Sequence, residues 1–144
     1  MSATTLRVLI SLFFVVHGWI HFSLTTVPVP APGALRTPFL PTWKRPNIDP
    51  LWPAAKLKLS DATARVLGSV LWVSTVVGFC LAGLCLLAFP GTAILWQASA
   101  VFGAVTSLLL LVLYWHPWLP IGILIDIAVL VGIILRVPAI LFPK

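Results

Sequence analysis

The sequence predicts an all-α polytopic membrane protein, a bundle of four transmembrane helices with a proline-rich interfacial cap between helices one and two. The 144 residues are 60% hydrophobic and 8% charged, and their mean hydropathy is +1.12. Soluble domains carry about 25% charged residues, so this composition excludes a soluble enzyme, a disordered chain and a disulfide scaffold. Four apolar stretches each contain about the 20 residues that a helix needs to cross a bilayer.

The first predicted span covers residues 6–26. Arg7 precedes an apolar run, which is also typical of a cleaved signal peptide. The run is long, however, it contains His17, Trp19 and His21, and no A-x-A cleavage pattern follows it. We therefore expect a retained helix.

Residues 27–59 hold eight prolines and are predicted to form a stiff cap on the membrane surface. Each proline keeps the preceding residue extended. Trp43 and Trp52 alternate with five basic residues in this segment, and tryptophan together with lysine and arginine favours the headgroup layer. The alternative is a flexible linker, but such linkers are rich in Gly and Ser tracts, which this segment lacks.

The second, third and fourth spans are predicted at residues 63–89, 92–114 and 119–137. Ser60 can cap the second span, Pro90-Gly91 forms a turn pair, and Pro120 suits the first turn of the fourth helix. The connections between these spans are short. We therefore expect the three spans to be sequential antiparallel neighbours.

Nine basic residues and three acidic residues give the chain a net charge of +6. This charge suits anionic lipid headgroups, and because most basic residues lie beside apolar spans we expect no nucleic-acid partner. The positive-inside rule predicts that the long first connection is cytoplasmic and that both termini lie outside. Arg7 favours the opposite orientation of the first helix.

Three titratable residues, His17, His21 and Asp126, fall inside predicted spans. Such residues within a membrane mark either function or helix pairing. His17 and His21 are four residues apart and share a helix face. A rise of about 1.5 Å per residue gives the histidines and Asp126 similar depths, with Trp72 near the depth of His17. Arg65 lies nearer the membrane surface, from which its long side chain can reach deeper. The sequence therefore predicts an intramembrane polar cluster of these five residues.

Three interpretations of this cluster remain open: it locks helices together, it handles protons or a ligand, or it binds a metal or haem. Two histidines at this spacing can share a metal, but no third ligand is evident. His116 and Trp118 are expected to be interfacial anchors. Cys80 and Cys85 lack a metal-binding spacing. We predict no metal site and no resident cofactor, with quinone or haem as the alternatives.

Small residues recur at every fourth position in two spans, a pattern that allows close helix approach in membranes. They are Ser74, Gly78 and Ala82 in the second span, and Ser99, Gly103 and Ser107 in the third. We expect them to serve helix packing, with Gln97 and Thr106 available for interhelical hydrogen bonds.

The sequence contains no recognised catalytic motif, and it contains no Glu. The G-x-S-x-G elbow, the H-E-x-x-H zinc motif and the phosphate-binding glycine loop are all missing. The expected function is therefore not enzymatic: an accessory or structural subunit of a larger membrane assembly, with membrane lipids and other integral membrane subunits as partners. The alternative is a binding or redox-linked protein for an apolar ligand such as a quinone or a lipid.

The spacing of the cluster residues resembles that of small bacterial four-span proteins related to the DoxX-like membrane proteins. The motifs that carry this resemblance are His17-Gly18-x-x-His21, Arg65-x-x-Gly68-x-x-x-Trp72 and Trp115…Gly122-x-x-x-Asp126. It covers the four spans and leaves out the proline-rich segment. The resemblance implies a location in the bacterial inner (cytoplasmic) membrane and a link to redox or quinone systems. It implies no established reaction and no catalytic residue.

Overall fold

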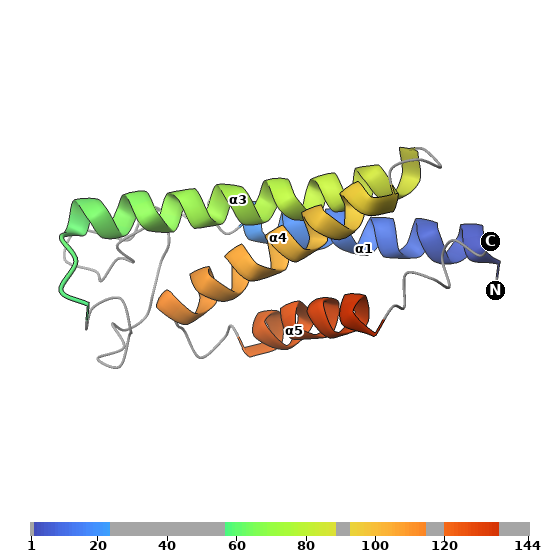
Figure 1. Ribbon diagram of the computed structural model, residues 1–144. Coiled ribbons are helices and arrows are strands. Elements are labelled where there is room, and N and C mark those ends of the chain that lie inside the picture. The colour runs from blue at the N-terminus through green and yellow to red at the C-terminus, as the bar shows by residue number, and fades with distance from the viewer. Residues whose placement is uncertain (1, 24–56, 89–92, 115–119, 136–144) are drawn as a thin grey trace.

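The computed structural model describes residues 2–23, 57–88, 93–114 and 120–135, and these form an all-α structure (Figure 1). The helices are α1 (Ala3–Ser23), α3 (Asp61–Ala88), α4 (Ala93–Leu113) and α5 (Pro120–Ile134). Three of them contain stretches long and apolar enough to cross a membrane, namely Ala3–Phe22, Val66–Leu87 and Leu95–Leu113. The predicted all-helical fold class is confirmed for the described residues.

The fourth predicted span, at residues 119–137, is not confirmed as a span. Helix α5 has 15 residues, which corresponds to a length of about 22 Å, whereas the hydrocarbon core of a bilayer is about 30 Å thick. The helix begins at Pro120, the position expected from its fixed φ angle. Residues 136–144 lie outside the described part of the chain.

The first helices begin with hydroxyl caps. The Ser60 Oγ accepts a hydrogen bond of 3.1 Å from the Thr63 N–H at the start of α3, as the sequence predicts. An equivalent cap starts α1, where the Ser2 Oγ accepts from the Thr5 N–H at 3.1 Å. Each such cap satisfies one free N–H of the first turn and stabilises its helix by about 1 kcal/mol.

Helix α3, with 28 residues, is the longest of the described helices and makes the most extensive contacts. It packs against both α1 and α4, while α5 packs mainly on α4. Successive helices run in opposite directions, and α4 crosses α3 at an angle (Figure 1). The small-residue stripes of α3 and α4 meet at Gly78, which faces Gly103 and the carbonyl oxygen of Ser99.

The apolar core lies where α1, α3 and α4 meet. It is built from the rings of Phe14, Phe79 and Trp96, each no more than 3% exposed, with Val129 and Leu130 of α5 packed against its edge. Large apolar side chains on the outer helix faces are exposed; they include Val66, Val70, Leu84, Leu95, Leu109, Ile121 and Leu124. An apolar exterior of this kind is what contact with lipid requires.

Several predicted surface residues lie outside the described part of the chain. They are residues 27–56 of the predicted cap, with Trp43 and Trp52, and the expected interfacial anchors His116 and Trp118. Arg65 belongs to α3, but its side chain is also outside what the structure describes.

Candidate functional site

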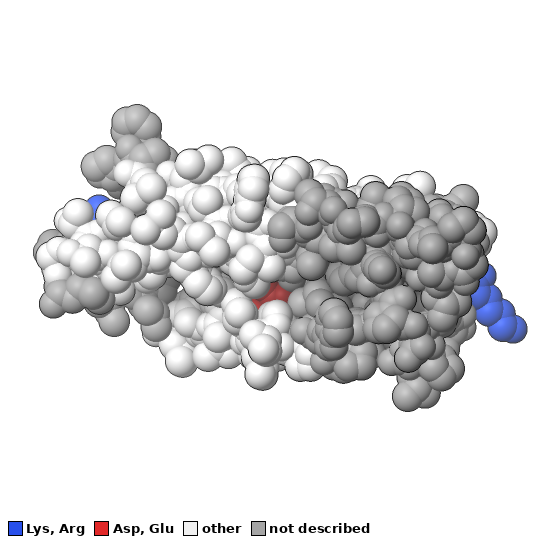
Figure 2. Space-filling view, turned by 180° about the vertical axis from the view of Figure 1, so that it is seen from behind, with Lys and Arg blue, Asp and Glu red and all other residues white. Residues whose placement is uncertain are grey.

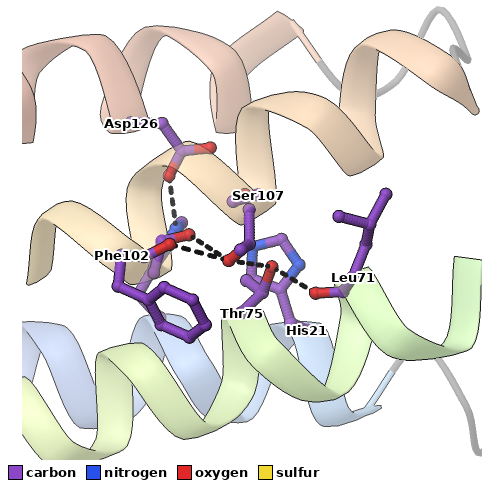
Figure 3. A network of polar contacts seen from close by, with 9 residues as sticks. His21, Leu71, Thr75, Phe102, Ser107 and Asp126 are labelled. Carbon is purple, nitrogen blue, oxygen red and sulfur yellow. Dashed lines mark hydrogen bonds and ion pairs between the residues drawn. The ribbon is translucent and has the colours of Figure 1, made fainter. Parts of the chain in front are cut away.

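Buried polar side chains from all four described helices meet near the middle of the bundle (Figure 3). The side chains of His17 and His21 come from α1, and Asp126 comes from α5. Their exposed fractions are 5%, 4% and 0%, respectively. Because α1 places residues four apart on one face, both imidazoles point from α1 into the bundle. These three titratable groups form the centre of what we call the polar cluster.

His17 and Asp126 join α1 to α5. The His17 Nε2 lies 3.3 Å from the Asp126 Oδ1, which is a long hydrogen bond. The imidazole is held by aromatic neighbours: Phe79 contacts it edge-on at a centroid distance of 4.6 Å, and Phe13 stacks on it at 5.8 Å. The second carboxylate oxygen, Asp126 Oδ2, is buried and has no hydrogen-bond partner among the described residues.

His21 continues the cluster toward α4. Its ring packs edge-on against the ring of His17, with a centroid distance of 5.0 Å and an interplanar angle of 87°. The His21 Nε2 lies 3.3 Å from the Ser107 Oγ. The other ring nitrogen, His21 Nδ1, is buried and unpartnered within the described part of the chain. The cluster therefore contains two buried polar atoms, one on each of two helices, whose hydrogen-bonding capacity is unused there.

Trp72 ties α3 to the end of α1. Its Nε1–H donates a hydrogen bond of 2.8 Å to the main-chain carbonyl oxygen of His21. The last carbonyl groups of a helix have no N–H partner within that helix, so this indole satisfies one of them. The Trp72 ring also stacks on Phe22 at 6.2 Å. Trp72 thus adjoins the cluster through the backbone of His21.

Hydroxyl groups extend the polar contacts between α3 and α4, and sequence reasoning missed most of their roles. Thr75 Oγ1 lies 3.2 Å from Thr106 Oγ1, and each hydroxyl also donates to a carbonyl of its own helix, that of Leu71 or Phe102. Ser107, expected to serve helix packing, is fully buried and also contacts His21. One sequence feature could have indicated the role of Thr75: it lies one helical turn after Leu71, on the helix face that carries Phe79.

The predicted members of the cluster are therefore placed as follows. His17, His21 and Asp126 come together, and Trp72 contacts the backbone of His21. The described partner of Asp126 is His17. The side chain of Arg65 is outside the described residues.

Among the described residues, the side-chain nitrogen, oxygen and sulfur atoms are not arranged as the ligands of a metal ion or a haem. The Nε2 atoms of His17 and His21 are directed to different partners, Asp126 and Ser107. No group of three His, Cys, Asp or Glu side chains in that part of the chain converges as metal ligands. Cys80 and Cys85 are half-buried and are not joined in a disulfide. The chemistry that this arrangement offers is hydrogen bonding and proton exchange.

Charged side chains are sparse around this site in the part of the chain that the structure describes. In Figure 2, basic side chains lie at the two ends of the molecule, and acidic side-chain atoms lie at the floor of a hollow near its middle. Along the outer helix faces, two open apolar grooves are lined by described residues, and neither of these includes a cluster residue. One is lined by Thr63, Val66, Leu67 and Val70, and the other by Gln97, Ala98, Val101, Phe102, Val105 and Ile133.

Comparison with known proteins gives no relative: no protein-family model, no curated protein and no solved structure matches this chain.

Proposed function

We propose that this chain is a binding protein of the bacterial inner membrane, whose polar cluster receives the polar head of an apolar molecule such as a quinone or a lipid. One observation carries the proposal. Asp126 Oδ2 and His21 Nδ1 are buried without partners in the described residues, whereas buried polar atoms in proteins are nearly always hydrogen-bonded. Each unmet group costs about 1–3 kcal/mol, so a ligand that satisfies both gains that energy.

The surroundings suit a ligand with a flat or small polar head and an apolar body. Phe13 and Phe79 place aromatic rings against the His17 imidazole, and Trp72 is held beside His21. The outer faces of the helices are apolar, so the remainder of such a ligand can stay in the bilayer. This kind of site, apolar with a few convergent polar groups, is typical of small-molecule binding.

Quinone titration of the purified protein tests the proposal. Decylubiquinone, added to the full chain in mild detergent, should quench tryptophan fluorescence with a saturable curve. His21→Phe keeps a ring and removes Nδ1, so it should weaken binding at least tenfold. Trp19→Phe is the matched control, because Trp19 is 63% exposed and lies outside the cluster. Quenching that rises linearly and equally in all three proteins would show simple partitioning into detergent.

A second candidate is an accessory subunit of a larger membrane assembly. The observation that favours it is the weak packing of α5, which lies mainly on α4. Three of its apolar side chains, Ile121, Leu124 and Ile134, are at least 65% exposed. A neighbouring membrane subunit would cover this face. Purification in mild detergent should then return a partner at stoichiometric yield, and recovery of the chain alone as a monomer would contradict this candidate.

A further inference from the structure

We propose that the His17–Asp126 pair is a proton-binding site, which holds one exchangeable proton between its two side chains in the resting protein. This inference is independent of the proposed ligand binding. It depends on the contact of 3.3 Å between the Nε2 and Oδ1 atoms and on burial, since Asp126 is 0% and His17 5% exposed.

The number of protons follows from the net charge of the pair. With two protons, an imidazolium faces a carboxylic acid and the pair is positive. With none, a neutral imidazole faces a carboxylate and the pair is negative. With one proton the pair is neutral overall, either as two uncharged groups or as an ion pair. An uncompensated charge within an apolar bundle is strongly disfavoured, so the state with one proton is favoured, and that proton belongs to the pair rather than to either residue.

The described residues around the His17–Asp126 pair contain no charged group that would change the number of protons it holds. On α1 the adjacent titratable group is His21, and on α3 it is Cys80, whose Sγ lies close to Gly18. The α4 neighbour is Ser107, a neutral hydroxyl, and α5 has no other titratable side chain among its described residues. Arg65, whose side chain is not described, would favour the state without a proton if it approached Asp126. The experiment below therefore discriminates that arrangement.

A proton is a ligand that the pair can take without an adjoining cavity, because it needs only the two polar atoms that already lie 3.3 Å apart. The edge-on contact between the two imidazoles and the contact of His21 with Ser107 continue the line of polar groups from α5 across α1 to α4.

The proton count is measurable on the full chain in lipid vesicles without any ligand. Infrared spectroscopy detects the C=O stretch of a protonated Asp126, and ¹⁵N NMR of labelled histidine distinguishes imidazole from imidazolium. Asp126→Asn and His17→Gln assign the two signals. The chain has three acidic residues, all Asp, so Asp49→Asn/Asp61→Asn leaves Asp126 as the one side-chain carboxyl and allows assignment even if Asp126→Asn does not fold.

The expected result is one protonated partner and no more: a carboxylic acid band with a neutral His17, or an imidazolium at His17 without that band. The signal should shift in D₂O, because the proton exchanges. Both groups protonated, neither group protonated, or a signal unchanged in D₂O would each overturn the proposal. Because no ligand is present, failure of quinone binding leaves this result unaffected, and the converse also holds.

Discussion

Gly78 of α3 and Gly103 of α4 bring the two helix backbones into direct contact. A Cβ atom built on Gly78 would lie 2.7 Å from both the N and the Cα atoms of Gly103, and 3.1 Å from the carbonyl oxygen of Ser99. These neighbours are main-chain atoms, which cannot rotate away as a side chain can. The crossing of α3 and α4 therefore requires glycine at this position.

Gly78→Ala should destabilise the protein by about 1–3 kcal/mol, since an added methyl group forces the helices apart. The measurement is unfolding in mixed detergent and SDS, followed by circular dichroism. Gly132→Ala is the matched control, because a Cβ on Gly132 meets nothing within 4 Å. Alanine in a helix interior is favoured over glycine by about 0.5–1 kcal/mol, so the control should be neutral or slightly stabilised. Equal effects of the two changes would contradict the close contact.

The His17–Asp126 contact should appear as an interaction energy in a double-mutant cycle. His17→Leu and Asp126→Leu each leave one polar partner buried and unpaired, whereas the double variant removes both. The expected coupling is about 1 kcal/mol, in the range measured for polar contacts between membrane helices. The same SDS unfolding assay reports all four free energies. Additive effects would mean that the two side chains do not interact in the membrane.

Trp72→Phe should cost about 1 kcal/mol, because the His21 carbonyl loses its hydrogen-bond donor while the ring is kept. Hydrogen exchange at the C-terminal turn of α1 should accelerate in this variant. Trp19→Phe supplies the comparison, since Trp19 is largely exposed and surface changes of this kind stay within about 0.5 kcal/mol. Unchanged exchange at the end of α1 in Trp72→Phe would argue against the bond.

The number of membrane crossings decides on which sides the termini lie. Four crossings, with the cytoplasmic first connection predicted by the basic residues, place both termini outside. Alkaline phosphatase fused to either end should then be active in a bacterial host, and green fluorescent protein fused there should be dark. Fluorescence of the C-terminal fusion alone would show that α5 does not cross.

The positions of the helices can be predicted from the sequence because the features that determine them are local. Apolar composition over about 20 residues and a hydroxyl cap at Ser60 depend on neighbours in the chain. The predicted length of the fourth span is not confirmed: the described helix covers Pro120–Ile134, whereas the apolar pattern covers residues 119–137. Apolar character alone does not determine where helical hydrogen bonding stops.

The depth of the site residues within the membrane could be predicted from the sequence, but the rotation of each helix about its own axis could not. Counting residues along each helix places His17 and Asp126 at one level, yet their contact also requires α1 and α5 to turn these faces inward. The bond from Trp72 to the His21 carbonyl and the contact of Ser107 with His21 depend on side-chain directions across three helices. These side-chain directions are determined by how the helices pack together, which cannot be predicted from any one segment of the sequence.

The sequence separation of the His17–Asp126 pair has a consequence for biogenesis. The two residues are 109 positions apart, and ribosomes add about 5–20 residues per second, so the imidazole is synthesised roughly 5–20 s before its carboxylate. During that interval the described neighbours of the His17 ring are Phe13, His21 and Phe79, on α1 and α3. Insertion of α5 is thus the step that gives His17 its carboxylate partner.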